Sequence, residues 1–349
     1  MAPKLIYAFA FLGVFSLSLA FLAGHRLHRK PAEGQIHKLL QEIQSSNPTT
    51  SLTKMQEAHY SFVVDAEQTK QIKLYKQLQQ EIAKRIPTEY DRPIIELKIH
   101  FNKTNKNSAK TIGILGGIGP LSDASIVEKL VKHIEPFSIK QNLSIHLLSM
   151  PPPRSTWEML TGGISYIKKL YEFASLDYSQ FFMASNTAHM HYEKFAKLTS
   201  AKAFNLPDTV IEKLKQQNPN GTSLNVLILD TQKAYRNKLY QKKLLKWGIK
   251  HVDLSASHRQ NLEHWIKKTK IGQVTSHDSF QFYQFIAALS SHYNAGAIIL
   301  ACTEIPLALS IHVSKLRERG ILVLDSESIL VDAIASYLAR PIKKEEDNN

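Results

Sequence analysis

Short apolar runs recur from residue 110 onwards, and amphipathic stretches separate them. A short, continuous apolar run is typical of a strand that is buried on both faces of a parallel sheet. Strands that alternate with helices predict an α/β fold with helices on both faces of the sheets. We expect strands at 112–115, 143–149, 181–184, 224–229, 295–300 and 321–326, and helices at 122–133, 164–174, 234–247, 280–293 and 329–338.

Two of these strands end in similar turns. Strand 181–184 runs into Ser185 and strand 295–300 runs into Cys302, and each nucleophile-type residue has a threonine close behind it. Open α/β sheets build their sites at the carboxyl ends of the strands. A lone cysteine can also be a small buried hydrophobe, but the repeated arrangement favours one pocket with Ser185 and Cys302 facing each other.

A glycine-rich turn joins strand 112–115 to helix 122–133. Gly117 and Gly119 allow close approach of the backbone, and amides at a helix start can hold an anion. Ser122 stands where a dinucleotide fingerprint needs glycine, so the turn is more typical of a carboxylate cradle. The alternative is that the glycines serve only a tight turn.

A proline-rich loop at 150–156 contains Arg154. The prolines restrict the loop, and the planar guanidinium suits a bidentate contact with a carboxylate. Arg154 is therefore a candidate substrate ligand, with a plain surface arginine as the alternative.

The first 109 residues do not continue the pattern of short apolar runs separated by amphipathic stretches. Segment 5–24 is uncharged and long enough to cross a bilayer, and a basic cluster follows it. We expect a transmembrane anchor or signal segment at 1–24, and hence a membrane-anchored or exported protein, with the side of the membrane open. Residues 25–109 are expected to be a basic spacer or added subdomain, with a helix at 66–86 and a strand at 94–101.

Two α/β domains are expected in the remainder. The first comprises 110–206 and is completed by 321–340; the second comprises 207–320. Each set of strands ends its key strand in the same way, and we expect the two key turns to face each other across one pocket.

Composition and charge exclude some classes of function. The 349 residues are 43% hydrophobic and 21% charged, as in an ordinary folded enzyme, and one cysteine excludes an intramolecular disulfide. The net charge of +14 comes from scattered lysines without a recognition motif, so we expect no nucleic-acid partner. Two explanations of the positive charge remain: a basic surface that lies near anionic lipid, and attraction of a small acidic substrate. His189 and His191 do not share a helix face, so we expect no metal site.

Four motifs together resemble the aspartate/glutamate racemase superfamily, and most closely its aspartate racemase-like branch. They are GGIGP at 116–120, SNTAH at 185–189, ACTEIP at 301–306 and LDSE at 324–327, and the resemblance spans about 110–340. It implies two pseudo-symmetric α/β domains with the site between them, commonly in a homodimer. It also implies inversion of the α-carbon of acidic amino acids without pyridoxal phosphate, metal or other cofactor, by two cysteines on opposite faces of the substrate.

The resemblance assigns roles to individual residues. Cys302 matches the second catalytic cysteine, and Ser185 stands where the first would be. His189 and Glu304 would be flanking groups that tune or relay. The substrate-binding positions implied are Gly117, Gly119, Arg154, Asn186, Thr187, Thr231 and Thr303.

Three positions depart from the family pattern. Ser185 replaces a cysteine, Gln232 stands at a position that is often lysine, and Leu330 stands where a histidine is expected. A hydroxyl is far less acidic than a thiol and needs an adjacent base to react. We therefore expect a racemase for aspartate or glutamate that is biased towards one enantiomer. The alternatives are a single-cysteine relative with other dicarboxylate chemistry, such as a decarboxylase or isomerase, and a non-catalytic, membrane-tethered binding protein.

Overall fold

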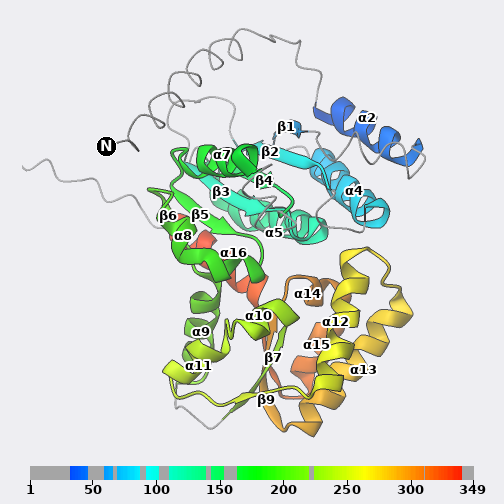
Figure 1. Ribbon diagram of the computed structural model, residues 1–349, viewed down its shortest axis with the longest axis vertical. Helices are drawn as coiled ribbons and strands as arrows, with labels where there is room; N and C mark the ends of the chain where they lie inside the picture. The colour runs from blue at the N-terminus through cyan, green and yellow to red at the C-terminus, as the bar shows by residue number, and fades with distance from the viewer. Residues whose placement is uncertain are drawn as a thin grey trace, which may run out of the picture.

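The computed structural model describes residues 32–45, 59–65, 69–86, 92–101, 110–138, 143–152, 163–219, 224–309 and 311–339. Within these residues two sheets form two lobes, the first in the upper and the second in the lower part of Figure 1. The first sheet has the strand order β1-β2-β4-β3-β5-β6, and the second has the order β10-β9-β7-β8.

The strands of the first sheet are β1 (His59–Asp65), β2 (Ile94–His100), β3 (Lys110–Gly116), β4 (Leu143–Ser149), β5 (Gln180–Met183) and β6 (Lys202–Ala203). Those of the second are β7 (Asn225–Asp230), β8 (His251–Val252), β9 (Ala295–Ala301) and β10 (Leu322–Asp325). The helices of the first lobe are α2 (Ala32–Ser45), α4 (Thr69–Arg85), α5 (Pro120–Ser138), α7 (Gly163–Ala174) and α8 (Tyr192–Ala196), and a 3-10 turn η2 spans Thr187–His191. The remaining helices are α9 (Leu206–Gln217), α10 (Gln232–Arg236), α11 (Gln241–Lys246), α12 (Ala256–Lys270), α13 (Ser276–His292), α14 (Glu304–Leu309), α15 (His312–Glu318) and α16 (Ser326–Leu338).

The predicted α/β class with largely parallel sheets is confirmed. Every residue of β4 is buried, and Ile298, Ile299 and Leu300 of β9 are fully buried, because helices cover both faces of each sheet. One pairing differs, since β2 runs antiparallel to β4.

The described residues before residue 110 belong to the first lobe. β2 pairs with β4 and β1 pairs with β2, so both strands extend the sheet. The alternation in β2 buries Ile95, Leu97 and Ile99 in the same core as β3 and β4. α2 packs on α4 and α4 packs on α5, so this segment covers one face of the lobe. The helix expected at 66–86 corresponds to α4.

Two expectations need correction. The single helix expected at 234–247 is two helices, α10 and α11, because Lys238 adopts a left-handed φ of 53° and Tyr240 turns into the core. Segment 321–340 does not complete the first sheet, because β10 pairs in parallel with β9 of the second. Its helix, α16, packs on α5 of the first lobe at the junction of the lobes (red in Figure 1).

Segment 5–24, the expected anchor, lies outside the described residues. Among the residues that the structure does describe, no helix is long and apolar enough to cross a membrane.

Candidate active site

The turns that follow four parallel strands meet at the junction of the two lobes. Gly119 follows β3 and Ser185 follows β5 in the first lobe, and Thr231 follows β7 and Cys302 follows β9 in the second. Hydrogen bonds cross between the lobes, so each lobe contributes one wall of the candidate site. Arg154 lies outside the described residues, so its predicted place in this site stays a prediction.

Cys302 is buried and points its thiol at a carboxylate. Its side chain is 3% exposed, and Sγ donates to Glu304 Oε2 at 3.0 Å. Burial is the main cause that raises the pKa of the Cys302 thiol well above its usual value, and the charge of Glu304 raises it further. The resting cysteine is therefore a thiol with a proton acceptor in place.

Glu304 rests on the glycine-rich turn of the first lobe. A Cβ atom added to Gly119 would lie 2.2 Å from Glu304 Oε1, so a residue with a side chain would displace the carboxylate. Gly117 has a φ of 110°, and a Cβ there would lie 1.9 Å from the carbonyl oxygen of Met150. Both positions therefore require glycine, one for the backbone path and one for the approach of Glu304.

Asp123 in the first turn of α5 holds that turn in place. Its Oδ2 accepts hydrogen bonds from the Gly117 amide at 2.9 Å and from Ser149 Oγ at 2.6 Å. Burial raises the pKa of Asp123 to about 7 despite these two donors. The nearby Glu304 acts in the same direction, whereas Arg92 of the N-terminal segment lowers the pKa.

Ser185 is half-buried at the end of β5, and the neighbouring histidine contacts its backbone. His189 Nδ1 donates to the Ser185 carbonyl oxygen at 2.8 Å. Burial lowers the pKa of His189 to about 4, so the ring is neutral near pH 7. His189 thus fixes the turn through the carbonyl group of Ser185.

Asn186 joins the Ser185 turn to the second lobe. Its Nδ2 donates to Ser326 Oγ at 2.9 Å, and its Oδ1 accepts from the buried Tyr240 hydroxyl. Ser326 Oγ in turn donates to the carbonyl oxygen of Leu300, two residues before Cys302. The two turns with nucleophile-type residues are therefore tied together through Ser326.

The predicted substrate-binding threonines bridge the lobes. Thr187 Oγ1 and Thr231 Oγ1 are 3.0 Å apart, and Thr231 also caps α10 by accepting from the Ala234 amide. Ser122 Oγ of α5 donates to Thr303 Oγ1 at 2.7 Å. Two hydroxyl pairs thus close the junction, and opening either pair would release groups that can bind a carboxylate.

The model of the Asp/Glu/hydantoin racemase family matches residues 115–334, which include the turns after β3, β5, β7 and β9. The chain belongs to this family.

Two relatives, one compared by sequence and one by structure, are similar to this chain. RacX of Bacillus subtilis, a broad specificity amino-acid racemase, is 22% identical over 243 residues, which cover 65% of this chain and 98% of RacX. The structure of Picrophilus torridus aspartate racemase is 23% identical, with a TM-score of 0.51, and covers 68% of this chain and 97% of that one. The racemase match begins at residue 115, so α2, β1, α4 and β2 lie outside it.

Two of the three residues that depart from the family pattern, Gln232 and Leu330, follow β7 and β10 of the second sheet. The backbone N–H of Gln232 donates to Glu263 Oε2 at 3.0 Å, and Gln232 lines a cavity of about 650 Å³ with Arg259 and Glu263. Leu330 is fully buried in the core, so no polar group stands at this position of α16.

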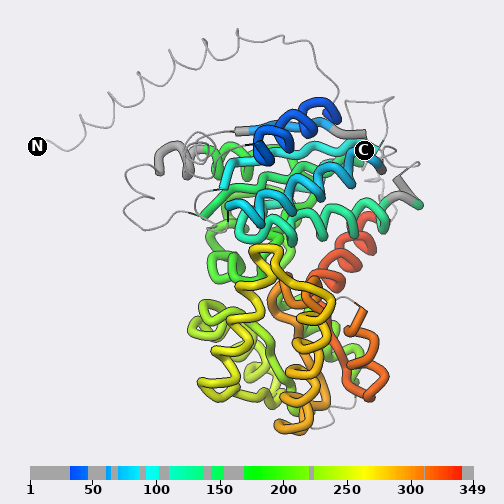
Figure 2. The backbone as a smooth tube through the Cα atoms, turned by 90° about the vertical axis from the view of Figure 1, so that its right-hand side faces the viewer, coloured from blue at the N-terminus to red at the C-terminus, as the bar shows by residue number. Residues whose placement is uncertain are grey.

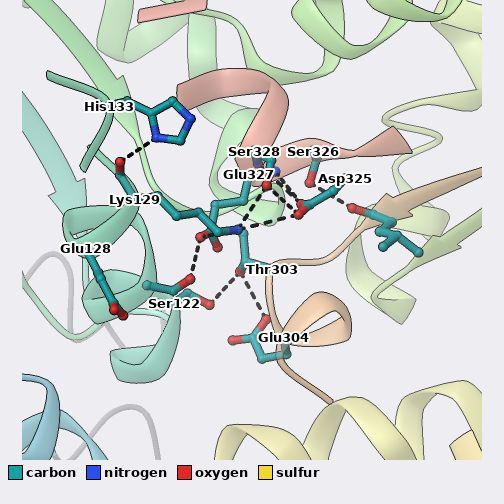
Figure 3. A network of polar contacts seen from close by, with 12 residues as sticks. Ser122, Glu128, Lys129, His133, Thr303, Glu304, Asp325, Ser326, Glu327 and Ser328 are labelled. Carbon is teal, nitrogen blue, oxygen red and sulfur yellow. Dashed lines mark hydrogen bonds and ion pairs between the residues drawn. The ribbon is translucent and has the colours of Figure 1, made fainter. Parts of the chain in front are cut away.

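An ionic network behind the racemase turns was not predicted from the sequence. Lys129 Nζ lies 3.0 Å from Glu327 Oε1 and 3.5 Å from Asp325 Oδ2 (Figure 3). Ser125 Oγ donates to Glu327 Oε1 at 2.6 Å. The Ser122–Thr303 bond lies beside this network. The motif LDSE contains two of these residues, but only the fold shows that they face α5.

Proposed function

We propose that the protein is a cofactor-independent amino-acid racemase that acts on aspartate or glutamate. The observation that carries the proposal is the Cys302–Glu304 hydrogen bond of 3.0 Å, in a turn tied through Ser326 to the turn of Ser185. Family membership supports the reaction class. Cys302 supplies a proton donor, Glu304 supplies a proton acceptor, and Ser185 supplies a hydroxyl group.

The proposed first step transfers a proton between Cys302 and Glu304. The thiol proton passes to Glu304 Oε2, and the thiolate then takes the α-proton of the enantiomer that faces it. A thiolate formed from a thiol of raised pKa is a stronger base, which suits a weakly acidic C–H bond. Water or the Ser185 hydroxyl returns a proton on the opposite face, and the hydroxide or alkoxide left behind is neutralised by the proton that Glu304 took, relayed through solvent.

This arrangement predicts unequal rates for the two enantiomers. Ser185 has no described contact with a base at its hydroxyl, because His189 binds its carbonyl oxygen. A hydroxyl without an adjacent base abstracts a proton poorly. The enantiomer whose α-hydrogen faces Cys302 is therefore the faster substrate.

We propose that the substrate's α-carboxylate opens the Thr187–Thr231 pair and binds both hydroxyls. Both threonines sit at lobe edges, and their 3.0 Å separation is a hydrogen bond that a carboxylate can replace with two. Arg154 is the proposed ligand of the side-chain carboxylate, and the net charge of +14 attracts acidic substrates.

The deciding experiment is α-proton exchange in deuterated water, followed by NMR with L- and D-aspartate and L- and D-glutamate. The full chain should exchange at least one of the four, and Cys302→Ala should abolish the exchange. Absence of exchange in the wild type with all four would end the proposal.

One observation favours a second candidate, decarboxylation of a dicarboxylate by the single cysteine. Burial holds Cys302 as a thiol, and a thiol can protonate the carbanion that is left when carbon dioxide departs. Release of carbon dioxide from substituted malonates, lost in Cys302→Ala, would support this reaction over racemisation.

We also propose that segment 5–24 attaches the protein to a membrane and that the chain forms a homodimer. The proposals rest on the uncharged segment followed by a basic cluster, and on the family resemblance. Fractionation of cells that express the full chain tests the first, and light scattering of the detergent-extracted protein tests the second.

A further inference from the structure

A cavity of about 520 Å³ lies on the other side of α5 and α14 from the candidate active site. It is bounded by α4 and α5 of the first lobe, and by the α12–α13 turn and α14–α15 of the second. The two sides touch, since a Cβ at Gly272 would lie 3.4 Å from Lys84 Cγ. Figure 2 shows the yellow α12–α13 turn reaching the helices of the first lobe. The volume falls within the ~300–1,000 Å³ that is typical of small-molecule sites.

The cavity is separate from the racemase residues but shares walls with them. On α5, Ser122 bonds Thr303 at the active site, whereas Leu121 lines the cavity. On α14, Glu304 accepts from Cys302, whereas Leu307 lines the cavity. The α4 wall lies before residue 115, outside the racemase family match, so this site is a feature of this chain.

The lining combines an apolar surface with positive charge. Ile311 lies at the rim and is 74% exposed. Lys76 and Lys84 stand on the α4 side, and none of the described lining residues is an aspartate or glutamate. The apolar lining residues are Leu121, Ala124, Val274, Leu307, Ala308 and Ile311.

Both lysines keep donors for a ligand. Lys76 Nζ lies 2.7 Å from Glu128 and Lys84 Nζ lies 3.5 Å from Glu81, and neither carboxylate lines the cavity. An ammonium group has three donors, so each lysine can bind a ligand anion while keeping its partner. Ser276 at the start of α13 adds a hydroxyl group on the opposite wall, where the Thr275 hydroxyl already donates to Asp278 in the capping box of α13.

From this lining we infer that the cavity is a second ligand site, which takes a small amphiphilic anion with an apolar body and one carboxylate. The apolar body lies on α5, α14 and the turn before α13, and the anionic group lies between Lys76 and Lys84. The added N-terminal segment thereby gives the racemase fold a binding site of its own.

The experiment measures binding of decanoate to the full chain by isothermal titration calorimetry, with decyltrimethylammonium as the charge-reversed probe. Decanoate should bind with a Kd in the millimolar range or tighter, as a ligand of this size allows, and the cation should bind at least about tenfold more weakly. Equal binding of the two probes would overturn the inference. Because binding is measured and turnover is not, the result is independent of the proposed racemase activity.

Matched variants locate the site. Lys84→Glu reverses a charge at the cavity and should weaken decanoate binding at least about fivefold, whereas Lys242→Glu, at an exposed position of α11, makes the same charge change elsewhere and should not. Leu307→Trp fills part of the cavity and should also weaken binding, whereas Leu245→Trp, at a leucine that is 62% exposed, should not. Decanoate affinity that is unchanged in both cavity variants would show that the ligand binds elsewhere and would refute the site.

Discussion

Cys302 and Glu304 form the pair on which the chemistry of a single residue can be tested most directly. Their atoms are 3.0 Å apart, and the charge of Glu304 adds to burial in raising the pKa of the thiol. Because Cys302 is the only cysteine of the chain, every thiol reagent reports on it alone. The pH at which it becomes a thiolate is therefore measurable without removing other residues.

Glu304→Gln should lower the pKa of Cys302, because a neutral amide no longer repels the thiolate. Alkylation by iodoacetamide, measured by mass spectrometry over a pH series, should then reach half of its maximal rate at a lower pH. α-Proton exchange should fall at least about tenfold in the same variant, because the proton acceptor is lost. Glu212→Gln, at an exposed position of α9, is the control. An unchanged alkylation profile in Glu304→Gln would contradict the pairing.

Ser185→Cys should raise the exchange rate of the slower enantiomer by about tenfold or more, because a thiol with a pKa near 8.5 is a far better base than a hydroxyl. The ratio of initial exchange rates of the L and D substrates, followed by NMR, should move towards one. Ser175→Cys, at an exposed position after α7, adds the same thiol away from the site and should leave the ratio unchanged. A ratio that stays constant in Ser185→Cys would mean that this hydroxyl does not face the substrate.

At the scale of elements, the β3–α5 turn depends on a carboxylate that is costly to ionise. Asp123 has a pKa raised from 3.8 to about 7, so between these values the folded chain holds a proton that the unfolded chain releases. Its contribution to stability is therefore present below about pH 4 and is lost as the pH rises through 7. Asp123→Asn should remove this loss of stability at high pH, because an asparagine side chain does not ionise.

The difference in unfolding free energy, Asn variant minus wild type, should grow from pH 4 to pH 8 by up to about 4 kcal/mol, from the shift of about three pKa units. Urea unfolding at each pH, followed by circular dichroism, measures it. Asp177→Asn, at an exposed position, should show no such trend. A difference that is constant with pH would mean that Asp123 is ionised in the fold.

Several elements were predictable from the sequence because their environment is uniform. β4 is buried along its whole length and its bounds were predicted as observed, since both faces of a covered strand must be apolar. The break between α10 and α11 was not predictable, because it depends on Tyr240 entering the core to reach Asn186, 54 residues earlier. Strand β1 was also missed, because only its pairing with β2 makes it a strand.

The reactive residues of the candidate site were predictable from the sequence, but the contacts that support them were not. Cys302 and Ser185 could be selected because a small reactive residue follows each buried strand. Their supporting contacts could not, because Ser122 and Thr303 are 181 positions apart and Ser125 and Glu327 are 202 apart. Such pairs arise only when two lobes fold against each other.

At the scale of the whole molecule, Lys129 of α5 and Glu327 of α16 fasten the first lobe to the second. Glu327 is 1% exposed, and burial raises its pKa to about 7 although Lys129 lowers it. Lys129→Met leaves this carboxylate buried without its cation. We expect a loss of about 3 kcal/mol at pH 8, measured by urea unfolding.

The loss in Lys129→Met should shrink at pH 5, where Glu327 is protonated and the missing cation matters less. Lys132→Met on the same helix breaks an exposed pair with Glu128 and should cost less than about 1 kcal/mol at either pH. Equal losses in the two variants would mean that the buried network does not hold the lobes together.

The N-terminal segment is part of the same whole, and its removal should unfold the edge of the first lobe. A chain of residues 110–349 loses β1, β2, α2 and α4, which uncovers the edge of β4 and the face of α5 on which α4 packs. An exposed apolar strand edge promotes aggregation. We expect this chain to elute as aggregates on size-exclusion chromatography and to melt at a lower temperature by circular dichroism. A chain of residues 32–349 keeps all these elements and should behave as a folded protein. Monodisperse 110–349 with the melting temperature of the longer chain would show that the racemase lobes fold without the added segment.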